Sequence, residues 1–555
     1  MKKKLNLQKL TAVLLTASIL LGTVYTGGTA AAEPESAATA PAGGAAQQSG
    51  GEPYIIGENT AKRTENEKHF YLSDGSMVAA LYDTPVHYKD ENGNYEPIDN
   101  SFSEGLTELE TKSGPQKIKL AKKASAKKLV TLHYGDYQLS WGFEGANKSR
   151  AEVQSQPEST DPLAVKNVTS ETLFKNAFEG ADLQYIVSPL GVKENIILNA
   201  KTAPHTFTQN YSSNKLTPRQ TNPQTVTLYF GEQAVYTVTA PVMTDAAGAL
   251  SDALTLQLVS AKNGKFQIKL TADSAWLNDP ARVYPVTVDP TVLSKSGTAS
   301  IQNKYLTSAN SNLSASGSVY VGNQKNGMGV VRTAVKFSNL PALERGDMVC
   351  SARMYLEQRT YSHVNEPSQQ IHAHEIAENW SGFSSSSPGI YTTANPKDTG
   401  KVLDYVITTA SNNAKQIYWD ITSTVKKWYN GGNNYGILLK PSDARWALVQ
   451  LASSFHTVGF YPVLAIYYRN NRGLEDYWSY TEQDLGAGTG YVNDYSGNLV
   501  VNLPVCSTGS AANAAGLSLY YNGYQAGRHY AVWRGGSTYD PSKSICGAGW
   551  KTNFD

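Results

Sequence analysis

Hydrophobic and polar residues alternate in short stretches along most of the chain. Between about residues 54 and 290 these stretches are separated by turns rich in Gly, Asp and Asn, which is the pattern of antiparallel strands joined by hairpins. Residues 90–94, DENGN, contain an Asn-Gly pair that favours a tight hairpin turn. We therefore expect a β-rich region over residues 53–290, either one large sandwich or two smaller ones that meet near residues 150–165.

The pattern changes at residues 417–440, where a strand is followed by a short helix and a second strand. Asp420 or Thr422 can cap the helix by accepting a backbone N–H bond, and two glycines at 431 and 432 end it. Three apolar residues spaced at i, i+4 and i+7 define one helical face, which must be buried: Ile421, Val425 and Trp428.

This stretch resembles the DNRLRE repeat, a family related to family 96 of carbohydrate-binding modules. The resemblance rests on an Asp and a Thr before a short helix, a Trp, and an Asn-Tyr-Gly that leads into a strand: Asp420, Thr422, Trp428, Asn434, Tyr435 and Gly436. It extends over residues 291–470. The resemblance implies a jelly-roll-like β-sandwich that binds carbohydrate and is not catalytic.

Other segments resemble bacterial wall-associated proteins that carry Rhs or YD repeats. Four spaced stretches of the N-terminal region carry this likeness: KRTENEKHFYLSDG, HYKDENGNYEPIDNS, ADLQYIVSPLGVKENIIL and SAWLNDPARVYPVTVDPTV. Residues 471–499 resemble the connector that precedes the β-strand shell of such proteins, and residues 500–555 resemble the start of a truncated shell. The expected fold class is therefore all-β: tandem jelly-roll-like sandwiches, one short helix in the second, and the start of a β-strand shell.

The N-terminus predicts export. Lysines crowd the first nine residues, an apolar run follows over residues 10–24, and small residues precede Glu33, which is the order of a secretory signal. We expect a signal peptide over residues 1–32, cleaved between Ala32 and Glu33, and a flexible linker over residues 33–52. The run is shorter than the roughly 20 residues of a membrane span. We expect no span after signal removal, and an extracellular or wall-associated location in a Gram-positive bacterium.

The net charge limits the classes of binding partner, and the cysteine content limits the disulfides that can form. The 48 Lys and Arg nearly balance the 47 Asp and Glu, for a net charge of +1, so no global field attracts nucleic acid. We predict no nucleic-acid partner and no cofactor. With 34 tyrosines and 46 glycines, the composition suits short strands and tight turns. Of the three cysteines, Cys506 and Cys546 can form a disulfide in an exported chain.

His372 and His374 form a His-x-His pair on a predicted strand, a spacing that metal sites use. No third ligand is visible in the sequence. The alternative, which we favour, is that Ile371 and Ala373 face the core while both histidines face solvent. We therefore predict no metal site.

Flat aromatic rings and guanidinium groups are the side chains that hold sugars and acidic glycans. The candidate glycan contacts in the second module are Arg359, Tyr361, Trp380, Tyr391, Arg445 and Trp446. Trp428 is excluded because its helical face must be buried. Carboxylates close in sequence, among them Glu357 and Glu375, are weak candidates for glycosidic cleavage, and no hydrolase or phosphate-binding motif is present. We predict that the chain is not an enzyme.

The sequence leaves three functions open. The main hypothesis is a secreted, non-catalytic surface or wall-associated protein whose module binds a polysaccharide or cell-wall glycan. The alternative is the N-terminal casing of an Rhs/YD-repeat toxin-delivery polypeptide, with a downstream Rhs/YD-repeat polypeptide as a further partner. A polysaccharide-degrading enzyme is a third hypothesis and rests only on the type of module.

Overall fold

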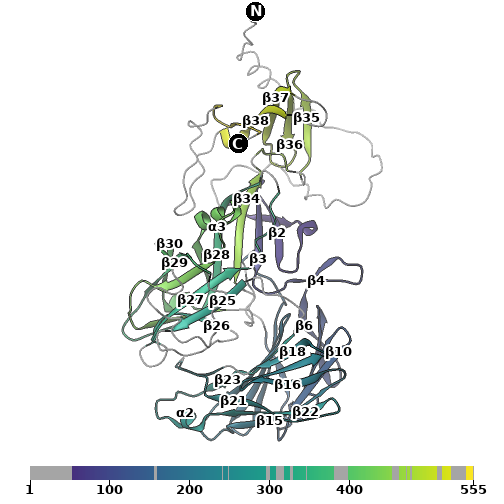
Figure 1. Ribbon diagram of the computed structural model, residues 1–555, viewed down its shortest axis with the longest axis vertical. Coiled ribbons are helices and arrows are strands. Elements are labelled where there is room, and N and C mark those ends of the chain that lie inside the picture. Colours follow the sequence, from purple (N-terminus) through teal and green to yellow (C-terminus); the bar gives the residue numbers. More distant parts are fainter. Residues whose placement is uncertain are drawn as a thin grey trace, which may run out of the picture. The chain divides into compact units, whose positions relative to one another are not determined.

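The structure, a computed structural model, describes residues 53–155, 159, 161–239, 242–247, 249–294, 301–307, 318–324, 329–344, 347–379, 398–452, 462–470, 472–475, 478–508, 515–526 and 546–553. Over these residues strands dominate and the helices are short (Figure 1). The predicted all-β fold class is therefore confirmed.

An N-terminal sandwich is formed by two antiparallel sheets. The eight-stranded sheet has the order β21 (Leu254–Lys262), β22 (Lys265–Ala272), β15 (Thr206–Ser213), β10 (Tyr137–Phe143), β9 (Val130–Tyr134), β8 (Lys117–Ala121), β7 (Glu108–Ser113) and β6 (Asp99–Glu104). The eleven-stranded sheet has the order β11 (Ala151–Val153), β12 (Ser170–Phe178), β13 (Ala181–Ser188), β14 (Gly191–Leu198), β24 (Thr291–Ser294), β18 (Gln233–Thr239), β17 (Thr225–Phe230) and β16 (Thr217–Asn222), with β19 (Met243–Asp245), β20 (Leu250–Ser251) and β23 (Val286–Val288) as branches. Buried residues of both sheets form one core cluster, so residues 99–294 form one sandwich, whereas residues 55–82 belong to another sheet.

A second sandwich is formed by one curled thirteen-stranded sheet. Its order is β1 (Ile55–Glu58), β2 (Glu67–Leu72), β3 (Met77–Tyr82), β34 (Val463–Asn470), β28 (Asp347–His363), β33 (Ala447–Ala452), β26 (Ser318–Gln324), β27 (Gly329–Phe337), β32 (Ile437–Pro441), β29 (Gln369–Ile376) and β30 (Asp398–Thr408); β25 (Ile301–Thr307) pairs with β27, and β31 (Lys415–Asp420) pairs with β28. The inner face of this sheet carries the second core cluster.

The first strands of the chain belong to this second sheet. β3 pairs with β34 from Met77 opposite Tyr468 to Tyr82 opposite Val463, and Figure 1 shows β3 in purple beside the yellow-green β34. A third apolar cluster joins the outer side of these strands to residues 163–168 of the N-terminal sandwich. The predicted domain boundary at residue 290 stays a prediction. A strand before this boundary, β3, is nevertheless hydrogen-bonded to a strand after it, β34.

Helix α3 (Thr422–Tyr429) has the buried face that the sequence predicts, but neither predicted residue is its N-cap: that position is Ile421, which makes no side-chain capping bond. The three residues of the predicted apolar face are buried: Ile421, Val425 and Trp428. Of the two candidate caps, Asp420 accepts a hydrogen bond from the backbone N–H of Thr422 at 2.9 Å. The hydroxyl of Thr422 instead accepts from the backbone N–H of Ala352 at 2.9 Å. The helix is thereby attached to β28, whose buried strand lies beneath it.

A separate C-terminal sheet has the order β35 (Tyr480–Asp484), β36 (Thr489–Asn493), β37 (Leu499–Thr508), β38 (Ala515–Asn522) and β39 (Trp550–Thr552). The predicted hairpin turn at Ser496 and Gly497 lies between β36 and β37, and Gly497 has a φ of 68°. The DENGN hairpin is present as the ribbon of β4 (His87–Lys89) and β5 (Tyr95–Pro97). The remaining short elements are η1 (Thr60–Lys62), α2 (Ser274–Asn278), η2 (Ala410–Asn412) and α4 (Gly523–Ala526).

Candidate functional site

An open groove lies between β30 and β31 of the second sandwich. Its volume is about 630 Å³, and its walls are Asp404, Tyr405, Val406, Ile407, Gln416, Ile417 and Tyr418. The two strands follow each other in the chain, yet β30 is hydrogen-bonded to β29, and β31 to β28. The groove is therefore the gap between two consecutive strands that belong to different parts of one curled sheet.

Polar and aromatic side chains line this groove. The Asp404 carboxylate accepts a hydrogen bond from the backbone N–H of Asp420 at 2.9 Å, which ties the two strands together at one end. Tyr405 is 48% exposed. The guanidinium of Arg353 lies 4.8 Å from the ring centre of Tyr418. Aromatic faces beside a carboxylate and an amide are the chemistry that holds a sugar ring.

Arg359, a predicted glycan contact, adjoins the groove indirectly. Its guanidinium pairs with the buried carboxylate of Glu357 at 2.6 Å, and Glu357 lies opposite Gln416 in the register of β28 and β31. Burial raises the pKa of Glu357, while the hydrogen bond from Arg359 lowers it. Arg359 therefore compensates a buried charge next to a residue of the groove wall.

Three other predicted residues meet at a separate corner of the second sandwich. Tyr361 is buried and donates its hydroxyl to the carbonyl of Glu366 at 2.8 Å. Arg445 lies 3.8 Å from the Glu366 carboxylate. Trp446 is 40% exposed, and its carbonyl accepts from the N–H of Val364 at 3.0 Å. Of these three predicted residues only Arg445 and Trp446 are exposed, and Arg445 also pairs with Asp443 at 3.0 Å.

Four predicted residues lie outside the described part of the chain: Trp380, Tyr391, and the signal-cleavage residues Ala32 and Glu33. Conversely, sequence reasoning missed Tyr405 and Tyr418. The available signal was weak: Tyr418 stands between the apolar Ile417 and Trp419, which indicates that it faces the opposite side of the sheet from them, but Tyr405 follows a polar residue, Asp404, and shows no such pattern.

The His-x-His pair lies on β29, and the rings of His372 and His374 are 6.1 Å apart. Ile371 and Ala373 are buried as expected, but His374 is also buried, with 3% exposed, so the expectation that both histidines face solvent is wrong. Burial and the charge of Lys440 lower the pKa of His374 to about 4. Among the described residues no group of three or more His, Cys, Asp or Glu is placed to hold a metal ion.

Cys506 and Cys546 are free thiols, so the predicted disulfide is not formed in this structure. Cys506 on β37 lies near Leu517 at one end of β38, whereas Trp550, which follows Cys546 closely, pairs with Tyr521 at the other end. A disulfide needs Cα atoms within about 7 Å. β37 and β39 lie on either side of β38, and two strands separated by a third are about 10 Å apart. This spacing and the register along β38 together keep the two thiols too far apart for a disulfide.

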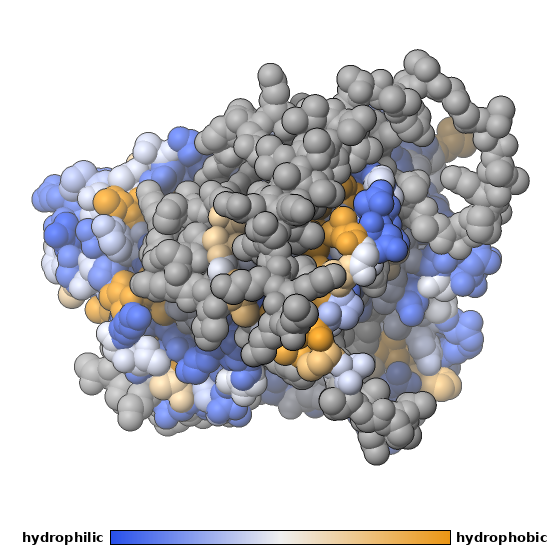
Figure 2. Space-filling view, turned by 90° about the horizontal axis from the view of Figure 1, so that it is seen from above, coloured by the Kyte–Doolittle hydropathy of each residue, from blue (hydrophilic) through white to orange (hydrophobic). Residues whose placement is uncertain are grey.

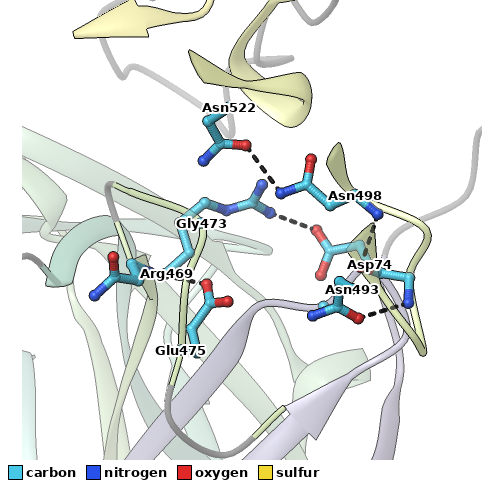
Figure 3. A pocket seen from close by; sticks show the side chains of 10 residues that line it. Asp74, Arg469, Gly473, Glu475, Asn493, Asn498 and Asn522 are labelled. Atoms are coloured by element: carbon cyan, nitrogen blue, oxygen red, sulfur yellow. Dashed lines mark hydrogen bonds and ion pairs between the residues drawn. The ribbon is translucent and has the colours of Figure 1, made fainter. Parts of the chain in front are cut away.

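A small polar cavity of about 10 Å³ lies where β34 meets the C-terminal segment. Figure 3 shows Arg469 directed at Asp74, and Asn498 beside Asn522. The amide of Asn498 donates to the side-chain carbonyl of Asn522 at 3.0 Å, and burial raises the pKa of Glu475. The small volume and the internal hydrogen bonds suit a structural joint better than a ligand site.

Three of the exposed apolar residues lie on β30, namely Val402, Tyr405 and Ile407, and the others are on other segments. Figure 2 shows small apolar patches between hydrophilic residues on the face that it presents. No helix in the described part of the chain combines the length and hydrophobicity of a membrane span.

The comparisons place the chain beside bacterial wall-associated proteins. It is 26% identical over 414 residues to the tRNA3(Ser)-specific nuclease WapA of Bacillus spizizenii, and the match covers 69% of this chain and 16% of that protein. The tRNA nuclease WapA of Bacillus subtilis matches with the same identity and coverage. A wall-associated protein of Geobacillus stearothermophilus is 27% identical over 148 residues, which are 26% of this chain and 58% of that protein. No protein-family profile matches the chain.

These comparisons confirm the likeness to wall-associated proteins and support a location at a Gram-positive cell wall. They also correct one prediction. We predicted that the chain is not an enzyme, yet its WapA relatives are named as nucleases that act on tRNA. The absence of hydrolase motifs misled the prediction, because the matched residues amount to 16% of the length of these relatives.

Proposed function

We propose that the chain is the exported, wall-associated portion of a WapA-like toxin-delivery polypeptide whose activity is the cleavage of tRNA. The observation that supports this most is the similarity to WapA over 69% of the chain. The fold is compatible with a carrier role. The pairing of β3 with β34 and the apolar cluster between the two sandwiches join residues 55–470 through hydrogen bonds and buried contacts.

A fractionation experiment tests this proposal. The full chain, fused after Asp555 to a reporter, is expressed in a Gram-positive host, and the medium, wall, membrane and cytoplasm are separated. We expect the reporter in the wall fraction, from which cell-wall digestion releases it. A variant without residues 1–32 is the control and should stay in the cytoplasm. Reporter found only in the medium or the cytoplasm with the full chain would contradict the proposal.

We also propose that the second sandwich binds a wall glycan in the groove between β30 and β31. Tyr405 supplies an exposed ring, and Asp404 and Gln416 supply polar partners on opposite walls. The volume of about 630 Å³ lies within the range of small-molecule sites. The corner formed by Arg445 and Trp446 is the competing location.

Three variants of the full chain decide between the two locations: Tyr405→Ala, Trp446→Ala and Arg359→Ala. Binding to isolated walls and to neutral and acidic polysaccharides is measured by sedimentation. We expect Tyr405→Ala to weaken binding by roughly three- to tenfold, the worth of one aromatic contact, and Trp446→Ala to leave it unchanged. The reverse result would move the site to the corner. Arg359 does not line the groove and acts only through Glu357, which lies opposite Gln416 of the groove wall. Arg359→Ala should therefore weaken binding less than Tyr405→Ala does. A larger effect would contradict the groove as the binding site.

A further inference from the structure

Five exposed cations gather on two adjoining segments of the N-terminal sandwich, residues 122–128 and 148–150. They are Lys123, Lys127, Lys128, Lys148 and Arg150, and we name this surface the cationic edge. The whole chain has a net charge of only +1. The cationic edge is therefore a local concentration of positive charge that the net charge of the whole chain does not reveal.

The backbone holds the two segments together. Lys123 and Arg150 lie directly opposite each other in an antiparallel bridge. The backbone N–H of Ala124 donates to the carbonyl of Ser149 at 3.0 Å. The turn that follows packs against β10 so closely that a Cβ at Gly142 would collide with its backbone. The fold thus fixes these cations at one place on the surface.

Two carboxylates close to these segments pair with lysines other than the five. Glu104 pairs with Lys122 at 3.0 Å, and Glu152 pairs with Lys175 at 2.7 Å. Within the described residues, no ion pair is found for the five cations of the cationic edge. Like charges directly opposite in an antiparallel pair are destabilising, so Lys123 facing Arg150 violates a local rule. Such violations in a stable fold are expected where a surface serves a partner.

We propose that the cationic edge binds an anionic polymer whose charge is carried by phosphodiester groups on a flexible, non-aromatic backbone. This inference rests on the proposed wall association, and it names the class of partner. Lysine is a point charge that suits phosphate without requiring a fixed geometry. Residues 121–129 and 146–151 contain no aromatic residue. The stacking platforms that favour single-stranded nucleic acid are therefore missing from these segments.

The test compares two triple variants of the full chain with the same change of charge. The first removes part of the cationic edge: Lys123→Gln, Lys127→Gln and Lys128→Gln. The control removes three exposed lysines on the β21–β22 hairpin of the same sandwich: Lys262→Gln, Lys265→Gln and Lys269→Gln. The probes are poly(glycerol phosphate), polygalacturonate and tRNA, each measured over a range of salt concentrations.

We expect the unmodified chain to bind poly(glycerol phosphate) and the first variant to bind it roughly 10- to 100-fold more weakly, since each cation near an anionic surface contributes measurably. The slope of log K against log salt should fall in size by about 2, the value for three contacts to a flexible strand. The control should bind like the unmodified chain. Equal loss in both variants, or no loss in the first, would overturn the assignment. Tighter binding of tRNA would overturn the non-aromatic polymer as the partner, and tighter binding of polygalacturonate would overturn phosphodiester groups as the charge that is recognised.

Sedimentation with isolated walls separates this inference from the proposed function. Walls are used intact or after removal of their phosphodiester-linked polymers with hydrofluoric acid. The inference is supported if the unmodified chain binds intact walls, if the first variant does not bind them, and if the unmodified chain does not bind stripped walls. Binding that survives both changes leaves wall association in place and overturns the inference. No binding to intact walls, together with tight binding of poly(glycerol phosphate), would count against the proposed function alone.

Discussion

The guanidinium of Arg469 lies 2.8 Å from the carboxylate of Asp74, although the two residues are 395 positions apart in the chain. Arg469 stands near the end of β34, and Asp74 stands in the turn between β2 and β3. Next to this pair, the Trp478 ring stacks on Tyr495 at 4.9 Å and lies 5.2 Å from Tyr71. These contacts attach the C-terminal segment to the strands that complete the second sandwich.

Asp74→Ala should lower the free energy of unfolding of the second sandwich by about 3 kcal/mol, because a mostly buried guanidinium would lose its carboxylate. Urea unfolding followed by tryptophan fluorescence measures this change. Arg219→Ala is the control, since its pair with Glu232 is exposed on both sides and such pairs contribute little. A midpoint for Asp74→Ala equal to that of the control would contradict the prediction.

Because Glu194 is buried, we expect the stability of the N-terminal sandwich to depend on pH. Burial raises its pKa to about 7, against hydrogen bonds from Trp141, Tyr185 and Gln209. Because the folded pKa lies above the unfolded value of 4.5, the contribution of Glu194 to stability is fully present below pH 4.5. It is lost as the pH rises through 7. The expected loss is about 3 kcal/mol in total.

The substitution Glu194→Gln removes this titration. It also changes the donors that face the three partners, so the absolute stability of the variant decides nothing. The measurement is the melting temperature from pH 4 to 9. We expect the unmodified chain to lose stability relative to Glu194→Gln between pH 4.5 and 7. Parallel curves over that range would contradict the raised pKa.

The sequence predicts the local parts of this fold well. The face of α3 is visible because Ile421, Val425 and Trp428 repeat at helical spacing, and all three are buried. The turns at DENGN and at Gly497 are visible because their backbone conformation favours Gly or Asn. The pairing of β3 with β34 is not visible. All six residues of β3 are buried, which indicates covered faces but not which distant strand lies alongside.

The candidate site shows the same limit. The sequence marks Arg359 as a cation on a strand, but Glu357, its partner two positions earlier, was considered only as a catalytic acid. Tyr405 and Tyr418 line one groove, although β30 and β31 pair with different strands. The choice of pairing partner for each strand depends on the register of the whole curled sheet, and a local sequence pattern does not specify that register.

Two glycines after α3 should respond differently to substitution. Gly436 has a φ of 92°, and a Cβ there would collide with the carbonyl of Val335, whereas Gly431 has a φ of 84° and open space around it. Gly431→Ala should cost about 1 kcal/mol from backbone strain alone. Gly436→Ala should cost at least about 3 kcal/mol, because β27 and β32 must also move apart. Thermal unfolding measures both, and equal costs would contradict the collision.

The three cysteines predict a simple thiol count. All are free, so the denatured protein without reductant should react with three equivalents of a thiol reagent. Cys506 is exposed and should react in the native protein. Burial raises the pKa of Cys350, so it should react slowly until the protein unfolds. A count of one in the denatured state would restore the disulfide between Cys506 and Cys546.

His374 predicts that the second sandwich loses stability in acid. Its folded pKa of about 4 lies below the unfolded value of 6.5, so the unfolded chain takes up the proton first as the pH falls. The contribution of His374 is present above pH 6.5 and is lost progressively toward pH 4.

Replacing the imidazole by an apolar side chain of similar size, as in His374→Leu, should remove this acid sensitivity. His363→Gln, at an exposed position, is the control and should leave the pH dependence as it is. Urea midpoints from pH 4 to 8 measure both variants, and the imidazole resonances of the unmodified protein report the titration directly. An imidazole of His374 that titrates near pH 6.5 would mean that water reaches the ring. The burial on β29 that separates it from the more exposed His372 would then be wrong.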